Sequence, residues 1–151
     1  MTGDEFAVLV PLLREAFARD LVRDYGMSED TARAKAVAEI ELPLPGAGSP
    51  AGHSVFVVEV DNERVGHLWL AERRDAYEQS LFVYDIEIDE RHRGRGYGKA
   101  AMVFAENEAR RRGLARVALH VGGRNDIARN LYRSLGYEEN NVAMSKRIDI
   151  Q

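Results

Sequence analysis

The stretch "LFVYDIEIDERHRGRGYGKA", residues 81–100, joins a mostly apolar run to a basic segment that is rich in glycine. Its apolar half, 81–88, predicts a β-strand whose two faces are both covered. Its basic half carries three arginines, one lysine and three glycines within residues 91–99. A glycine-rich turn before a helix suits an anion, because the first helical turn presents free N–H groups that glycine lets a ligand approach. The sequence therefore predicts a phosphate-binding turn at the end of this strand.

Two common phosphate-binding motifs do not fit the glycine-rich turn. A P-loop needs a hydroxyl residue after its lysine, but alanine follows Lys99. A dinucleotide fingerprint needs a third glycine where Lys99 stands. What remains is the pattern R-x-x-G-x-G, which begins at Arg93 and is weak when taken alone. Its meaning therefore depends on the residues around it.

Apolar periodicity and turn residues predict the other elements of the chain. We expect helices at about 4–24, 28–40, 99–113 and 126–136, strands at 54–60, 65–71, 80–88 and 116–121, and one or two edge strands within 137–148. The stretch 42–52, with three prolines and three glycines, predicts a loop. This order predicts an α/β fold with a mixed, mostly antiparallel sheet and helices on both faces.

Composition limits the class of protein. The chain of 151 residues suits one domain, and 45% hydrophobic with 30% charged residues is typical of a globular protein. No apolar stretch is long enough to span a membrane, and the first residues lack the basic start of a signal peptide, so we expect no membrane association and a cytoplasmic location. The net charge of −4 argues against a nucleic-acid partner. The absence of cysteine excludes disulfides, thiolate zinc sites and cysteine nucleophiles.

A second motif, "LHVGGRNDIARNLYRSLGY" at 119–137, follows the glycine-rich turn. Together with "IDERHRGRGYGKA" at 88–100, it resembles the GNAT N-acetyltransferase family, and the small bacterial members in particular. The resemblance covers 54–148 well and implies a single acetyl-CoA-dependent domain over 1–151, with a helical part at 1–53 and a cofactor-binding core at 54–148. Two features depart from the family: Glu90 stands where proline is common, and the pattern starts with a helix where many members have a strand.

The resemblance implies acetyl-CoA as cosubstrate and requires no metal. Backbone N–H groups from Arg93 to Lys99 would hold the pyrophosphate, and the main chain of Ile86 and Ile88 would pair with the pantetheine arm. Asn125 is expected to cap the following helix or to lie near the pantetheine. The complete set of expected cofactor contacts is Ile86, Ile88, Arg93, Gly94, Arg95, Gly96, Tyr97, Gly98, Lys99, Asn125, Ala128 and Tyr132.

The expected catalytic residues are Tyr132, Glu87 and Asp85. The resemblance makes Tyr132 the general acid that protonates the leaving CoA thiolate, and the alternative is a tyrosine that only packs in the core. Strand alternation puts Glu87 and Asp85 on one face of an otherwise apolar strand, where buried acids are costly. We rank Glu87 first as general base and Asp85 second, with water as a third possibility and a merely exposed strand face as the alternative.

The chain has no cysteine nucleophile and no visible Ser/His/Asp arrangement that could form an acetyl-enzyme. Direct acetyl transfer to a primary amine in a ternary complex therefore fits the sequence best. A backbone N–H of the 81–88 strand could polarise the thioester carbonyl. The acceptor would be a small molecule or a peptide, which acids at Glu72, Asp75 and Glu78 could attract if they are not simply solvated. A non-catalytic acyl-CoA sensor and a transferase for another acyl donor stay open as alternatives. We expect a monomer or a homodimer.

The four histidines show no metal-site spacing. His120 follows a strand and could face the active cleft. His53, His67 and His92 are expected at the surface or in ordinary packing, and Trp69 is expected in the core.

Overall fold

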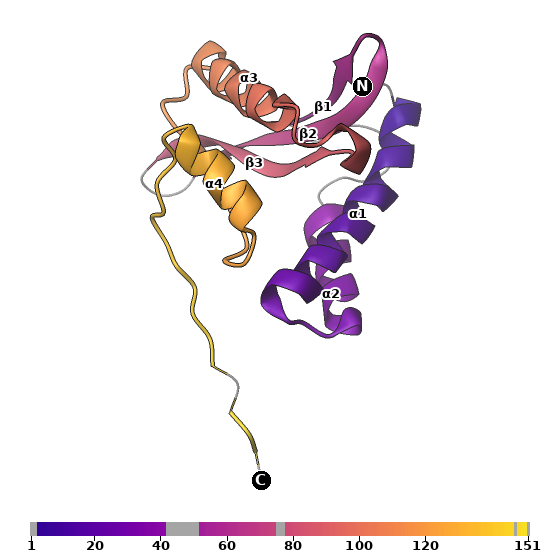
Figure 1. Cartoon of the computed structure of the whole chain (residues 1–151), viewed down its shortest axis with the longest axis vertical. Helices are drawn as coiled ribbons and strands as arrows, with labels where there is room; N and C mark the ends of the chain where they lie inside the picture. The colour runs from indigo at the N-terminus through magenta and orange to yellow at the C-terminus, as the bar shows by residue number, and fades with distance from the viewer. Residues whose placement is uncertain (1–2, 42–51, 75–77, 147, 151) are drawn as a thin grey trace.

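The glycine-rich turn joins the third strand of the sheet to a long helix, as the computed structural model of the chain shows (Figure 1). The structure describes residues 3–41, 52–74, 78–146 and 148–150. Its elements are α1 (Gly3–Tyr25), α2 (Glu29–Ala36), a wider π-type turn (Val37–Glu41), β1 (His53–Val60), β2 (Glu63–Arg74), β3 (Gln79–Ile88), a short 3₁₀ turn (Glu90–His92), α3 (Tyr97–Arg111), β4 (Val117–Leu119) and α4 (Asp126–Ser134). None of the described helices is both long and apolar enough to cross a membrane.

The predicted helices and strands are confirmed up to residue 136, with small differences at their ends. The predicted loop at 42–52 lies, except for its last residue, outside the described residues. The edge strands predicted within 137–148 are wrong, because the described residues 137–146 pair with no strand. The sequence does alternate there, but no strand in the described part of the chain pairs with it.

The sheet has the order β1-β2-β3-β4. The pairs β1–β2 and β2–β3 are antiparallel, and β3–β4 is parallel because α3 crosses over between them. Asp61 and Asn62 have positive φ angles of 52° and 63°, which suit the tight turn of the β1–β2 hairpin. The predicted mixed, mostly antiparallel sheet is therefore confirmed.

Helices cover both faces of this sheet (Figure 1). Side chains alternate along β2, so that Trp69 faces α1 while Leu68 and Leu70 face the opposite side, towards α3 and α4. The core under α1 consists of Leu9, Val10, Leu13, Ile40, Val55 and Trp69. The core under α3 and α4, called the second core below, includes Leu68, Leu70, Leu81, Val83, Met102, Ala105, Ala109 and Tyr132. Helix α2 packs on α1 through Ala32 and Ala36.

A bulge in β3 changes the relation between β3 and its neighbours. Trp69 pairs with Asp85 and Leu70 pairs with Val83, so Tyr84 is an extra residue on β3. Pairing of β3 with β4 is confined to residues 81–83 and 117–119, on the near side of the bulge. Beyond the bulge, 84–88 have no partner strand on the β4 side within the described part of the chain. The two strands therefore separate towards the glycine-rich turn.

Helix α3 is fixed to the sheet at the end far from the glycine-rich turn. The buried carboxylate of Glu108 lies 2.7 Å from the Arg112 guanidinium and 2.6 Å from that of Arg111. Hydrogen bonds from Arg111, and secondarily Arg112, lower the pKa of Glu108 to about 2, although burial opposes this. Arg112 also reaches Glu72 on β2 at 3.2 Å. The helix that begins at the glycine-rich turn is thus held in place by charged contacts at its other end.

Candidate active site

The glycine-rich turn is tied back to the end of β3. After the 3₁₀ turn, the Arg93 N–H donates to the Glu90 carbonyl at 3.2 Å. The Arg93 side chain donates through Nε to the Ile88 carbonyl at 2.8 Å, and its guanidinium lies 3.6 Å from Glu87. Arg93 therefore braces the turn against the strand, a role that the motif alone does not reveal.

The glycines of the turn are needed for two different reasons. Gly94 and Gly96 have φ angles of 72° and 85°, and a Cβ at either position would meet no described atom within 4 Å. Glycine is needed at both positions because their φ angles are positive, and the space beside them is open. A Cβ on Gly98 would instead lie 3.4 Å from Leu131 of α4 and 3.9 Å from Ile88. Gly98 allows α3 to begin close to both α4 and β3.

The start of α3 gives the open side of the turn its charge. The helix begins at Tyr97, and the Ala100 N–H already closes onto the Gly96 carbonyl at 3.0 Å. N–H groups before this point have no acceptor within the helix, and the helix dipole adds positive partial charge there. Arg95 and Lys99 are exposed beside them. The turn can therefore accept a polyanion on its open side.

Beyond the bulge, the backbone of β3 has one free edge. The Asp89 N–H donates to the Val65 carbonyl at 2.8 Å, so the backbone of Asp89 faces β2. Because successive residues of a strand face opposite edges, the N–H groups of Ile88 and Ile86 face the gap that opens between β3 and β4. An extended ligand could lie along this edge and reach the glycine-rich turn at its end.

Helix α4 places Tyr132 in the second core, against which Ile86 of β3 and Leu119 of β4 also pack. The predicted cap is confirmed, since the Asn125 side chain accepts from the Ala128 N–H at 3.2 Å. Tyr132 is buried in the second core, where half-buried Ala128 also packs. Burial, and secondarily the negative charge of Asp85, raises the pKa of Tyr132 to about 12. The tyrosine is therefore a protonated hydroxyl at neutral pH, close enough to β3 to sense its carboxylate.

Asp85 and Glu87 both lie on the α1 face of β3, as predicted, but their surroundings differ. The Asp85 Oδ2 lies 2.5 Å from Nε2 of His67, whose side chain is only 4% exposed. Glu87 pairs in register with His67 and approaches Arg93. His67, expected in ordinary packing, is thus a hydrogen-bond partner of a candidate base. No local sequence signal predicts this pair, because it arises from the register between β2 and β3.

Helix α1 adds a third acid, which the sequence analysis missed. Burial raises the pKa of Asp20 despite its neighbour Arg23, and the charges of Asp85, Asp24 and Glu87 raise it further. Asp20 is therefore close enough to the two candidate bases for their charges to act on it, and its own ion pair is with Arg23 at 2.9 Å. Its position three residues after Phe17, an apolar residue of the same helix face, was a signal that could have identified it.

Two of the three acids expected to attract the acceptor are already paired. Glu72 contacts Arg112 at 3.2 Å, and Glu78 contacts Arg116 at 2.9 Å. Asp75 lies outside the described residues. The turn before β3 thus offers less free negative charge than its sequence suggests.

The remaining histidines also have defined surroundings. His120 is exposed and lies edge-on to Phe82, with ring centroids 5.2 Å apart. His92 is buried, and half-buried His53 accepts from the Trp69 indole at 3.1 Å. Trp69 is fully buried, as expected. Within the described residues, no group of three or more histidines and acids is arranged to hold a metal ion.

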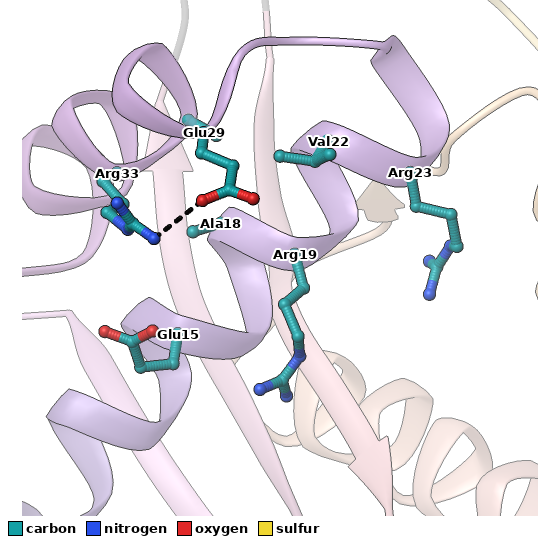
Figure 2. Close-up of a pocket in the computed structure, with 8 residues that line it drawn as sticks. Glu15, Ala18, Arg19, Val22, Arg23, Glu29 and Arg33 are labelled. Atoms are coloured by element: carbon teal, nitrogen blue, oxygen red, sulfur yellow. Dashed lines mark hydrogen bonds and ion pairs between the residues drawn. The ribbon is translucent and has the colours of Figure 1, made fainter.

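A hollow of about 280 Å³ lies elsewhere, between α1 and α2 (Figure 2). It is lined by Glu15, Ala18, Arg19, Val22, Arg23, Glu29, Ala32 and Arg33. An ion pair of 2.9 Å joins Glu29 to Arg33 at its edge. None of the residues predicted for the active site lines this hollow, so it is separate from the gap between β3 and β4.

Comparison with known proteins identifies the family. The family model described as "Acetyltransferase (GNAT) family" matches residues 13–137. The chain is 29% identical over 149 residues to the uncharacterized N-acetyltransferase YycN of Bacillus subtilis, covering 98% of this chain and 96% of that protein. The crystal structure of YycN superposes with a TM-score of 0.89 over 99% of this chain and 96% of that one, at 27% identity. Aminoglycoside N-acetyltransferase AAC(6')-Iy in complex with CoA shares the fold, with a TM-score of 0.59 and 20% identity over 78% of this chain and 88% of that one.

Proposed function

This chain belongs to the GNAT acetyltransferase family, and we propose that it moves an acetyl group from acetyl-CoA directly to a primary amine in a ternary complex. The acceptor is an amine of a small molecule or a peptide. The observation that carries the proposal is the free edge of β3 beyond the bulge, which connects the glycine-rich turn to the surroundings of Tyr132. The proposed phosphate site at the glycine-rich turn is thus followed by the free backbone edge of β3 and then by Tyr132 as the proton donor.

The glycine-rich turn and the free edge of β3 together assign the cofactor contacts. N–H groups between Arg93 and Lys99 bind the pyrophosphate, except that of Arg93, which donates to the Glu90 carbonyl, and Arg95 and Lys99 add positive charge. The backbone of Ile86 and Ile88 pairs with the amides of the pantetheine arm, which adds to the sheet like a short strand. The complex of AAC(6')-Iy with CoA supports this assignment through the shared fold.

Tyr132 acts at the leaving group. The amine nitrogen attacks the thioester carbonyl, whose oxygen is stabilised by a backbone N–H of β3. The bond between carbon and sulfur then breaks and the CoA thiolate takes the Tyr132 proton, while the nitrogen, on becoming the amide, gives its remaining excess proton back to the Tyr132 phenolate. A phenol that is fully protonated at neutral pH, as the pKa of about 12 makes Tyr132, is always available as donor.

A carboxylate on the α1 face of β3 removes the proton from the acceptor ammonium. Glu87 is the nearer to the glycine-rich turn and has the longer side chain, so we rank it first. Asp85 is held by buried His67 at 2.5 Å, an arrangement that fixes its orientation and supports it as the second candidate. Water that relays the proton is the third possibility.

The pH profile of kcat/KM distinguishes these bases. A general base works only when deprotonated, so kcat/KM rises with pH through its pKa. We expect Glu87→Gln to abolish this rise, to lower kcat/KM by about 100-fold, the lower end of general-base effects, and to leave acetyl-CoA binding unchanged. Asp85→Asn is the matched variant on the same strand face. A wild-type profile in Glu87→Gln would exclude that residue and assign the base to Asp85, if Asp85→Asn loses the rise, or to water, if neither does.

The proposed function is tested by a panel of amines with acetyl-CoA, in which release of free CoA thiol is monitored. The panel should include polyamines, aminoglycosides, amino acids and peptides with free N-termini. We expect at least one amine to accelerate thiol release above the rate without acceptor, with a product heavier by one acetyl group. Tight binding of acetyl-CoA without turnover on any amine would favour a sensor, and faster release from succinyl-CoA would favour another donor.

A further inference from the structure

An arginine lies on the α1 face of the sheet, apart from the glycine-rich turn. Arg73 is exposed near the end of β2, and alternation puts its side chain on the same face as Trp69. The guanidinium carbon lies over two rings of β3, 3.7 Å from the centroid of Phe82 and 4.7 Å from that of Tyr84. Its Nε and Nη2 also donate to the Tyr84 hydroxyl, at 3.2 and 3.0 Å. The guanidinium is therefore held in one position on the surface.

The rings under Arg73 are anchored in the core under α1. Tyr84 stacks on Trp69, with ring centroids 4.7 Å apart. Trp69 is fully buried, and its indole N–H donates to His53. Phe82 is also buried and meets Tyr84 edge-on at 5.1 Å. An arginine that is already ordered on such a base loses little further freedom when it binds a ligand.

The guanidinium keeps hydrogen-bonding capacity that Tyr84 does not use. Arginine presents its N–H groups as a planar fork, and the Tyr84 hydroxyl occupies only Nε and one side of Nη2. Within the residues that the structure describes, Nη1 has no acceptor and no carboxylate pairs with Arg73. The two Nη atoms are the ends through which arginine binds a carboxylate with parallel hydrogen bonds. The outer end of Arg73 therefore suits the carboxylate of a ligand.

Arg73 also supplies the permanent positive charge in this part of the α1 face. Burial, and secondarily the charge of Arg73, lowers the pKa of the nearby His53. The Nδ1 atom of His53 accepts from the Trp69 indole, which requires that nitrogen to be unprotonated. A guanidinium, in contrast, stays charged at any physiological pH. An anion that binds here therefore meets a fixed cation.

The position of Arg73 relates it to the gap between β3 and β4. Phe82 is next to the last residue of β3 that pairs with β4, and Tyr84 is the bulge residue that follows this pairing. The guanidinium above these two rings thus lies where the strands begin to separate. Asp85 and Glu87 follow beyond the bulge on the same face. A cation and two candidate bases therefore lie one after the other along the α1 face of β3.

The spacing along the sheet limits which ligands can reach both charges. Phe82 lies opposite Ala71 of β2, and Asp85 lies opposite Trp69. Two residues of strand cover about 7 Å, so the guanidinium over Phe82 and the carboxylate of Asp85 are separated by roughly that distance or more. An amine and a carboxylate on the same carbon are too close together to reach both groups. An amine that is several carbons away from its carboxylate can reach them.

We propose that Arg73 binds a carboxylate of the acceptor, so that the acceptor is an amino acid derivative whose reactive amine is several carbons away from its carboxylate. The inference rests on the proposed function, because the amine at the other end is the group that acetyl-CoA modifies. The ammonium then lies against the acids beyond the bulge and the carboxylate against Arg73. A polyamine would place a second ammonium against the guanidinium, and this repulsion selects against it.

Nα-acetyl-lysine and its C-terminal amide test the proposal, because they differ only in the charge at the carboxyl end. With acetyl-CoA and wild-type protein, we expect kcat/KM to be about tenfold higher for the acid or more, the size of a charge-assisted hydrogen-bonded pair. Arg73→Gln should lower kcat/KM for the acid to the value for the amide and leave the amide unchanged. Arg73→Lys keeps the charge without the planar fork and should retain part of the preference.

Arg74→Gln is the matched control. It removes the same charge from the next residue of β2, which is exposed on the opposite face, and it should keep the full preference for the acid. Because both arginines are exposed, circular dichroism should show an intact fold in each variant. Equal rates for acid and amide in the wild type, or a preference that survives in Arg73→Gln, would overturn the carboxylate site while acetyl transfer itself stands.

Binding without turnover separates this site from the proposed function. In ¹⁵N-labelled protein with CoA bound, Nα-acetyl-lysine should shift the amides of Phe82 and Tyr84, whereas its C-terminal amide should not. The shifts should disappear in Arg73→Gln. If neither compound is acetylated but these shifts occur, the carboxylate site stands and the proposed function fails. If the acid causes no shifts in the wild type, the carboxylate site is overturned, whatever the rates of acetylation.

Discussion

The Tyr132→Phe variant is expected to bind acetyl-CoA nearly as tightly as the wild type and to have a kcat lower by about 100-fold or more. The substitution removes only the hydroxyl and keeps the ring that packs in the second core. General acid catalysis typically contributes 10² to 10⁴, because a thiolate leaves faster when a positioned donor protonates it. Calorimetry with acetyl-CoA and the thiol-release assay measure the two quantities separately.

Tyr137→Phe is the matched control for this experiment. Tyr137 packs in the same core, with its ring centroid 5.9 Å from that of Tyr132, and its hydroxyl is also buried. Burial, followed by the charge of Glu106, raises its pKa as well. We expect Tyr137→Phe to keep its kcat. Equal losses in both variants would indicate damaged packing, and unchanged turnover in Tyr132→Phe would reduce Tyr132 to a packing role.

Gly96→Val is expected to weaken acetyl-CoA binding by at least about tenfold, and Gly98→Val should weaken it as well. At φ of 85° a β-branched residue is strained, and the valine side chain would occupy the open space in front of the start of α3. At Gly98 the added carbons would press on Leu131, which lies 3.4 Å from the first of them. A tenfold loss corresponds to about 1.4 kcal/mol and is readily measured by calorimetry.

Gly113→Val separates strain from loss of the ligand site. Gly113 has a φ of 71° and open surroundings, but it follows the other end of α3. The Gly113→Val substitution should lower the melting temperature of the protein about as much as Gly96→Val does, while the affinity for acetyl-CoA stays at the wild-type value. Unchanged affinity in Gly96→Val and Gly98→Val would contradict the assignment of the glycine-rich turn to the cofactor.

Local sequence signals were sufficient for most of the fold. The period of α1, the glycine-rich turn and the Asn125 cap depend on residues close together in the chain, and each was predicted correctly. The segment after Tyr137 shows where such signals fail. Its alternation predicts a strand, but a strand forms only when another backbone pairs with it, and no described part of the chain does so.

The site was predictable to the same degree. The motifs name the turn and Tyr132 as candidates because each belongs to a continuous stretch of sequence. The contact between His67 and Asp85 depends on strand register, and the approach of Asp20 depends on which face of α1 meets the sheet. The bulge at Tyr84 determines which backbone groups of β3 face the gap, and the local sequence pattern does not predict this bulge. These features are consequences of long-range packing.

Amide chemical shifts during titration with acetyl-CoA test the central claim most directly. In ¹⁵N-labelled protein, the amides of Ile86, Ile88 and 95–99 should shift on addition of acetyl-CoA, because they are the groups proposed to bind the pantetheine and the pyrophosphate. The amides of Ala18, Val22 and Ala32, which line the hollow between α1 and α2, should stay in place. Shifts confined to that hollow, with none along β3 and the glycine-rich turn, would contradict the account.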